Sequence, residues 1–146
     1  MRAFIRSLGT VAAAAVLSGL VSAAPARANL SVLSEISTQS MIVEVDGGYY
    51  ATWKVSTARR GYYTPRGSFS PSHLEKMHHS TLYENSPMPN SIFFRGNFAI
   101  HGTYYVRSLG RPASHGCVRL APADAATLYG LVQTHGLRNT RIFISD

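Results

Sequence analysis

The residues best suited to chemistry surround the single cysteine, Cys117, in the segment Ser114-His115-Gly116-Cys117-Val118-Arg119. A cysteine attacks as its thiolate, and a free thiol has a pKa of about 8.5, so it needs a neighbouring histidine or positive charge to react at neutral pH. His115 and Arg119 flank the cysteine, and His101 lies upstream. This set of residue types is suited to nucleophilic attack on a carbonyl carbon.

Gly116 permits a tight turn beside the thiol, and consecutive backbone N–H groups at Gly116 and Cys117 could bind a developing oxyanion. A structural interpretation is also open, because a lone cysteine is often a small buried hydrophobe and histidines often cap turns. However, an unpaired reactive thiol is a liability in an oxidising compartment, and His, Gly and Arg are unusual neighbours for a buried apolar group. The residues alone leave both interpretations open.

The first 28 residues have the pattern of a secretory signal peptide. The charged start contains Arg2 and Arg6, and an apolar run follows at residues 8–22. An A-x-A cleavage site comes next, at Ala26-Arg27-Ala28. An uncleaved anchor helix is the alternative, but the apolar run is short for a bilayer and Pro25 follows it. We therefore expect a signal peptide over residues 1–28 and one domain over residues 29–146, exported to the periplasm or cell envelope.

The composition agrees with one folded, exported domain. Hydrophobic residues make up 45% of the chain and charged residues 14%, which excludes a disordered tail. One cysteine excludes an intrachain disulfide and a multi-cysteine metal site. Without Arg2, Arg6 and Arg27, 11 basic side chains face 7 acidic ones, a net charge of +4. This charge suits an anionic envelope polymer, whereas scattered basic residues without a binding motif argue against nucleic acid.

Two β-hairpins are predicted upstream of the cysteine. Residues 41–45 and 49–57 have high β-propensity and flank the turn signal Asp46-Gly47-Gly48. Residues 91–94 and 98–101 flank Gly96-Asn97 in the same way. The second hairpin would deliver His101 to the end of a strand.

A helix and a closing strand are predicted downstream of the cysteine. Pro122 is typical of a first helical position, and Gly136 is typical of a helix stop. A helix over residues 122–134 would turn its apolar side chains toward the core, namely Leu128, Leu131 and Val132. Residues 140–145 predict the last strand.

Two stretches are predicted to be loops. Residues 58–67 break any period and would form a surface loop with three positive charges, Arg59, Arg60 and Arg66. Residues 71–90 lack a sustained apolar period and predict a long irregular insertion with a turn of helix near residues 74–78. The spacing of its histidines, His73, His78 and His79, does not match a zinc site, so we interpret them as solvated.

The cysteine segment and its surroundings resemble the L,D-transpeptidase catalytic domain, the YkuD-type cysteine transpeptidases of bacterial cell walls. The family motif is a histidine, usually followed by glycine, then a gap and S-H-G-C-x-R; His101-Gly102 and residues 114–119 supply it. Residues 53–57 and 64–69 also resemble the family's strand before a V-S-T-G turn and its T-P-x-G loop. Ala58 stands where glycine is usual, and the gap between the two motif halves is slightly short.

This resemblance implies a mostly β fold, a β-sandwich with one short helix in the C-terminal half, in agreement with the predicted hairpins. It also implies an enzyme in which Cys117 attacks the L-centred bond before the terminal D-Ala of a tetrapeptide stem and forms a thioester. His101 would be the general base, oriented by the carbonyl of Gly102. The backbone N–H groups of Gly116 and Cys117 would form the oxyanion hole.

Substrate binding is assigned by the same resemblance to Ser114, His115 and Arg119, with Arg119 suited to a stem carboxylate. Two structural alternatives stay open: Ser114 could simply hold the turn, and Arg119 could form a buried ion pair with Asp124. An amine would resolve the thioester, supplied by a second peptidoglycan stem, a free D-amino acid or an envelope protein. The resemblance implies no metal and no organic cofactor, and inhibition by carbapenems.

Two other functions compete with this hypothesis. A sortase-like or peptidoglycan-hydrolysing cysteine peptidase also uses Cys, His and often Arg, but a sortase usually has its arginine on a later strand, whereas Arg119 follows Cys117 by two residues. An inactive peptidoglycan-binding module is the non-enzymatic alternative. The chain lacks an S-x-x-K pair, so serine-based transpeptidation has no nucleophile here.

Overall fold

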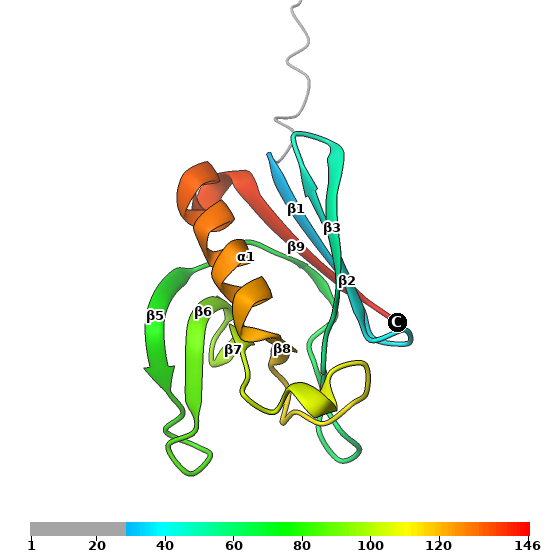
Figure 1. Cartoon of the computed structure of the whole chain (residues 1–146), viewed down its shortest axis with the longest axis vertical. Helices are drawn as coiled ribbons and strands as arrows, with labels where there is room; N and C mark the ends of the chain where they lie inside the picture. The colour runs from blue at the N-terminus through cyan, green and yellow to red at the C-terminus, as the bar shows by residue number, and fades with distance from the viewer. Residues whose placement is uncertain (1–28) are drawn as a thin grey trace, which may run out of the picture.

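The computed structural model describes residues 29–146, and the predicted signal peptide lies outside the described residues. Two β-sheets and one α-helix build the domain (Figure 1). The strands are β1 Leu30–Glu35, β2 Ser40–Val45, β3 Gly48–Lys54, β4 Gly67–Phe69, β5 His73–His79, β6 Pro87–Arg95, β7 Phe98–Gly102, β8 Val118–Leu120 and β9 Thr140–Ser145. The helices are α1 Pro122–His135 and two short 3-10 turns, η1 Val106–Ser108 and η2 Leu137–Asn139. The predicted mostly β fold with one helix is confirmed.

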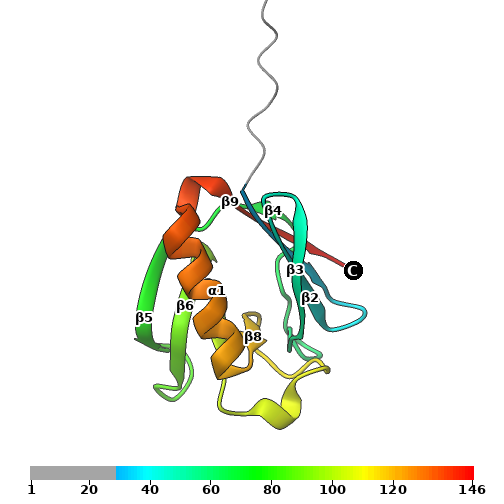
Figure 2. The same cartoon turned by 45° about the horizontal axis from the view of Figure 1, so that its top comes forward.

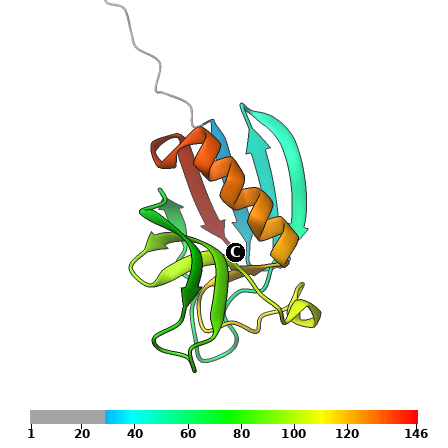
Figure 3. The same ribbon diagram turned by 60° about the vertical axis from the view of Figure 1, so that its left-hand side comes forward.

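The five-stranded sheet has the order β3-β2-β1-β9-β4. Its pairs are antiparallel except for β1 and β9, which lie parallel and side by side (Figure 3). Side chains along β1 and β9 alternate between core and solvent, as period-2 strands with one covered face require. The hairpin of β2 and β3 and the closing strand β9 were predicted, whereas β1 was not.

The four-stranded sheet has the order β5-β6-β7-β8. The predicted hairpin of β6 and β7 is confirmed, and His101 is the next-to-last residue of β7. Strand β8 pairs in parallel with β7 and places Arg119 opposite His101. Because Cys117 directly precedes β8, this pairing brings the histidine and cysteine segments onto neighbouring strands.

The predicted irregular insertion at residues 71–90 is wrong. Most of this stretch forms an antiparallel hairpin of β5 with β6, joined by a loop at residues 80–86, and residues 74–78 are extended rather than helical. Strand β5 lies at the edge of its sheet and is largely exposed, so polar residues are tolerated and no clean alternation develops. Pro87 and Pro89 suggested a break, but both lie within β6.

Helix α1 packs against both sheets, on β6 and β7 of one and on β1 of the other (Figure 2). Pro122 occupies the start of the helix, and Gly136 ends it with a φ of 86°. Leu128 and Val132 are fully buried in the core that both sheets share. The predicted helix and its core face are thus confirmed. Within residues 29–146, no helix has the length and hydrophobicity needed to cross a membrane.

Candidate active site

A cavity of about 580 Å³ lies over the four-stranded sheet, and both Cys117 and His101 line it. All of its lining residues fall between His73 and Arg119 in the chain, in β5 to β8 and their connections. The β5–β6 loop and residues 103–115 both lie at the lower end of Figure 1, and the ring of Tyr83 in that loop stacks on His115 with ring centroids 4.0 Å apart. The fold therefore brings the predicted nucleophile and the predicted base to one cavity.

The His101 imidazole is held in one orientation. Its side chain is buried, and Nδ1 lies 2.7 Å from the carbonyl oxygen of Gly102. Because a carbonyl can only accept, Nδ1 donates the proton of the neutral ring and Nε2 keeps the basic lone pair. Burial lowers the pKa of His101 to about 4, so the ring is neutral at pH 7 and able to take a proton.

The Cys117 thiol behaves differently from the sequence-based expectation. Burial raises the pKa of Cys117, and this effect outweighs the opposing influence of the Ala99 backbone amide and the Arg119 charge. The sulfur lies 3.7 Å from the carbonyl oxygen of Asn97, to which the protonated thiol can donate. At neutral pH the thiol of Cys117 and the imidazole of His101 are therefore both uncharged, so attack by this sulfur would need a base to take its proton.

Gly116 is required by the shape of the turn before the thiol. Its φ is 138°, and a Cβ there would lie 2.6 Å from a ring carbon of Phe98 and 2.8 Å from the backbone oxygen of Tyr63. A side chain at this position would therefore displace the ring and strain the backbone.

Ser114 holds this turn from within. Its buried hydroxyl donates to the carbonyl oxygen of Cys117 at 2.6 Å and accepts from the N–H of Gly116 at 3.0 Å. The N–H of Gly116 is therefore occupied, which corrects its predicted place in the oxyanion hole. The N–H of Cys117 donates to no polar atom within residues 29–146 and is the remaining candidate from that pair.

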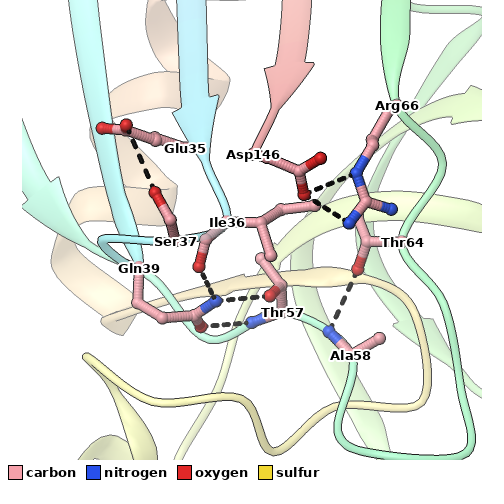
Figure 4. Close-up of polar contacts among 9 residues, drawn as sticks. All are labelled: Glu35, Ile36, Ser37, Gln39, Thr57, Ala58, Thr64, Arg66 and Asp146. Carbon is pink, nitrogen blue, oxygen red and sulfur yellow. Dashed lines mark hydrogen bonds and ion pairs between the residues drawn. The ribbon is translucent and has the colours of Figure 1, made fainter.

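A threonine outside the motif, Thr64, also stabilises the turn that contains Gly116 and Cys117. The Thr64 hydroxyl accepts from the N–H of Ala58 at 3.0 Å (Figure 4) and donates to the carbonyl oxygen of Gly116 at 2.9 Å. Thr64 belongs to the T-P-x-G resemblance, but its bond to the cysteine turn had no sequence signal. Ala58, at the position where glycine is usual, contributes only its backbone to this contact.

The segment after β3 is itself anchored to the five-stranded sheet. The side chain of Gln39 donates to the hydroxyl of Thr57 at 2.6 Å and accepts from the N–H of Thr57 at 2.9 Å (Figure 4). The same segment accepts backbone bonds from Ala113 and Ser114 through the carbonyl of Thr57. The cysteine turn is therefore tied to both sheets.

His115 and Arg119, predicted to bind substrate, both line the cavity. His115 is stacked on Tyr83 with ring centroids 4.0 Å apart, and Tyr62 meets it edge-on at 4.7 Å. Arg119 is partly buried, with its guanidinium 3.5 Å from the carbonyl oxygen of Ala113. Within residues 29–146 no ion pair joins Arg119 to Asp124.

His73, His78 and His79 are not on a loop, as the sequence suggested, but on β5. His73 and His78 line the cavity and His79 does not. Nδ1 of His78 lies 2.6 Å from one oxygen of Glu75, and Nε2 of His73 lies 3.5 Å from the other. In the described part of the chain, no group of three or more His, Cys, Asp or Glu side chains is placed to hold a metal ion.

Solved structures with this fold are L,D-transpeptidases. The L,D-transpeptidase from Mycobacterium smegmatis matches with a TM-score of 0.73 and 21% identity over 81% of this chain and 59% of that chain. The L,D-transpeptidase from Xylanimonas cellulosilytica matches with a TM-score of 0.68 and 26% identity over 83% of this chain and 62% of that chain. L,D-transpeptidase 3 from Mycobacterium tuberculosis, in complex with a faropenem-derived adduct, matches with a TM-score of 0.69 and 17% identity. That match covers 81% of this chain and 60% of that chain.

The chain thus spans about three fifths of the length of these structures. A sequence search of curated proteins returned no match. The family model of the L,D-transpeptidase catalytic domain, YkuD, matches residues 31–144, which is nearly all of the described domain. With the motif, the sheet order and this match in agreement, the chain belongs to the YkuD family of L,D-transpeptidase catalytic domains.

Proposed function

We propose that this chain is an exported cysteine L,D-transpeptidase that acts on peptidoglycan stem peptides. One observation carries the proposal: Cys117 and a neutral, fixed His101 line the same cavity, with the N–H of Cys117 free of protein partners in residues 29–146. These are the nucleophile, the base and an oxyanion donor of acyl transfer. Family membership supports the same reaction class.

The first half-reaction follows from the positions of these groups. Cys117 attacks the carbonyl carbon of the third stem residue while Nε2 of His101 takes the thiol proton. The oxyanion that forms accepts from the N–H of Cys117, and one such donor typically contributes about 2.7 to 4 kcal/mol. His101 then gives its proton to the departing D-Ala amine, which leaves a thioester on Cys117.

The second half-reaction transfers the acyl group to an amine. The amine could belong to a second stem, giving a 3-3 cross-link, to a free D-amino acid, or to an envelope protein. Arg119 lines the cavity and has no carboxylate partner within residues 29–146, which supports a contact with a stem carboxylate. His115 would form the adjacent wall, fixed between two tyrosines.

Substrate capture is assigned to the exposed basic loop at residues 58–67. Arg66 is paired with Asp146, with its Nε 2.8 Å from a carboxylate oxygen (Figure 4). Arg59 lies over the ring of Tyr62, 5.1 Å from its centroid, and so stands close to His115. We therefore expect charge reversal of Arg59 and Arg60 to weaken binding to purified sacculi more than reversal of Arg66. Equal binding by all variants would contradict this role.

Intact-mass spectrometry of residues 29–146 tests the proposal directly. The protein and its Cys117→Ala variant are incubated with a disaccharide-tetrapeptide and, separately, with a carbapenem. We expect an adduct on Cys117, release of D-Ala and a dimeric muropeptide, and none of these from Cys117→Ala. The faropenem-derived adduct of the Mycobacterium tuberculosis relative supports the choice of a β-lactam probe.

The other outcomes distinguish the competing functions. D-Ala release with only a tripeptide product would indicate hydrolysis by a carboxypeptidase. Binding to sacculi without any adduct would indicate a peptidoglycan-binding module. Cleavage inside a protein substrate with transfer to an amine would indicate a sortase-like enzyme.

Export is tested by expressing the whole chain in a bacterial host and measuring the mass of the protein recovered from the envelope fraction. We expect a chain that begins at Asn29, because the A-x-A site ends at Ala28. A full-length chain in the cytosol would contradict the proposed localisation.

A further inference from the structure

The wall of the cavity formed by β5 has a second imidazole beside a carboxylate. Glu75 is the one acidic side chain among the described residues that line the cavity. Its oxygens lie 2.6 Å from Nδ1 of His78 and 3.5 Å from Nε2 of His73. Neither group is used by the acylation chemistry proposed above.

Glu75 and His78 are three positions apart on β5, and both line the cavity. Asn90, on the partner strand β6, has a φ of 54°, and it lies between the pairs Glu75 with Ser91 and Met77 with Pro89. The ladder has no pair between Lys76 and Asn90. Lys76 instead lies over the ring of Tyr129 on α1, with its ammonium 5.2 Å from the centroid.

The contact with Glu75 fixes the proton on His78. An ionised carboxylate only accepts, so Nδ1 of His78 donates, and Nε2 keeps the basic lone pair of the neutral ring. His78 is also close enough to His101 that its positive charge would lower the pKa of His101. Two of the imidazoles that line the cavity are thus held in place, His101 by a carbonyl and His78 by a carboxylate.

Acyl transfer to a side-chain amine releases more protons than one base can accept. The acceptor enters as an ammonium ion, R–NH3+, because a simple alkylamine is protonated at neutral pH. Forming the amide N–H releases two protons. His101 can pass one of them to the departing thiolate of Cys117, which regenerates the thiol, and the other needs a separate acceptor.

We propose that His78, positioned by Glu75, takes the first proton from the acceptor ammonium in the active-site cavity. Nε2 of His78 accepts this proton, and the free amine attacks the thioester carbon. The C–N bond forms, the C–S bond breaks, His101 moves the second proton to sulfur, and His78 returns its proton to solvent. The Glu75 carboxylate also attracts the cationic acceptor. This inference rests on the proposed function and assigns its acceptor side.

The test separates acylation from aminolysis in His78→Gln, Glu75→Gln and a matched control, His79→Gln, whose side chain is exposed on the same strand and outside the cavity. Acylation of Cys117 is followed by intact mass, and the isolated acyl-enzyme is then mixed with an amine. Two amines are compared: lysine, whose side chain is an ammonium, and hydroxylamine, which is already unprotonated at neutral pH.

With lysine, we expect His78→Gln to slow aminolysis on the order of 10²-fold, as is typical for loss of a general base, while acylation proceeds. Glu75→Gln should slow this aminolysis less than His78→Gln does, because the imidazole of His78 is present but no longer oriented by a carboxylate. With hydroxylamine, both variants should approach the rate of the parent, and His79→Gln should match the parent with both amines.

An equal loss with both amines would mean that His78 only shapes the cavity, and it would overturn the proposal. Unchanged aminolysis of lysine by a normally acylated His78→Gln protein would overturn it as well, with the proposed function intact. A parent protein that is never acylated would instead overturn the proposed function, and with it this assignment.

Discussion

The two sheets of this domain divide framework from chemistry. The five-stranded sheet alternates core and solvent side chains in β1 and β9 and contributes no residue to the cavity. The four-stranded sheet and its connections contribute every lining residue, including buried polar groups such as His101 and Ser114. Substitutions in the first sheet should therefore change stability alone, and substitutions in the second should change chemistry.

The largest effect is expected for His101→Gln in the four-stranded sheet. Loss of the base should slow acylation of Cys117 on the order of 10²- to 10⁴-fold, because glutamine cannot take the thiol proton. The rate is measured by intact mass with a carbapenem and normalised to folded protein. A variant that acylates at the parent rate would show that the thiol is activated without His101.

Ile142→Ala is the opposite case in the five-stranded sheet. Ile142 is fully buried in β9, opposite Val32 and Phe69, so truncation should lower the free energy of unfolding by about 2 to 5 kcal/mol. Urea unfolding gives this value. Acylation per folded molecule should not change at low denaturant, and a specific loss of acylation would break the division between the sheets.

The histidine also predicts how stability depends on pH. The pKa of His101 falls from 6.5 to about 4 on folding, so the unfolded chain takes up a proton at higher pH than the folded one. The contribution of His101 to the free energy of unfolding is therefore fully present above pH 6.5, and it is lost as the pH falls through about 4. With about 1.4 kcal/mol for each pKa unit, the loss reaches about 3 kcal/mol. Unfolding curves of the parent and His101→Gln should differ in this slope, and identical slopes would contradict the burial effect.

Gly116→Ala should cost about 1 to 3 kcal/mol of stability, because its Cβ would collide with Phe98 and with the backbone of Tyr63 at a positive φ. Acylation should fall with it, since the turn positions the thiol. Gly130→Ala in α1 is the matched control. No atom lies within 4 Å of its new Cβ, so helix propensity should raise stability by about 0.5 to 1 kcal/mol. Equal effects at both glycines would refute the steric explanation.

The smallest effect is expected for Thr64→Val, which removes a hydroxyl that joins Ala58 to Gly116. The part-buried N–H of Ala58 and the buried carbonyl of Gly116 both lose a partner, so we expect the free energy of unfolding to fall by about 1 kcal/mol and acylation to slow. Thr64→Ser keeps the hydroxyl and should retain acylation. If Thr64→Ser and Thr64→Val acylate alike, the hydroxyl does not support the turn.

Local patterns were sufficient for the elements that have strong local signals. The β2–β3 and β6–β7 hairpins have turn residues between β-prone runs, and α1 has a proline at its start and a glycine at its end. Strand β8 has only three residues and depends on its pairing with β7. Strand β5 depends on being the edge of a sheet. These strands are set by tertiary pairing, which no short window of sequence contains.

The motif indicates candidate site residues where it is contiguous in the sequence, and it gives no signal where distant segments meet. The motif identified residues 101–102 and 114–119, but it could not show that the hydroxyl of Ser114 occupies the N–H of Gly116. Tyr83 reaches His115 from the β5–β6 loop, and nothing in its local sequence indicates this. Glu75 and His78 both line the cavity although they are three positions apart on β5, which strand alternation does not predict.

The protonated resting state of Cys117 also bears on how this thiol survives oxidants. Peroxides and disulfides react with the thiolate, and burial keeps the thiolate population of Cys117 below that of a free cysteine. In the proposed mechanism, the sulfur gains nucleophilicity when the imidazole of His101 removes its proton during attack on a bound carbonyl. On that mechanism, control of one proton would make Cys117 react with acyl substrates in preference to oxidants, which matters in a sequence that has one cysteine.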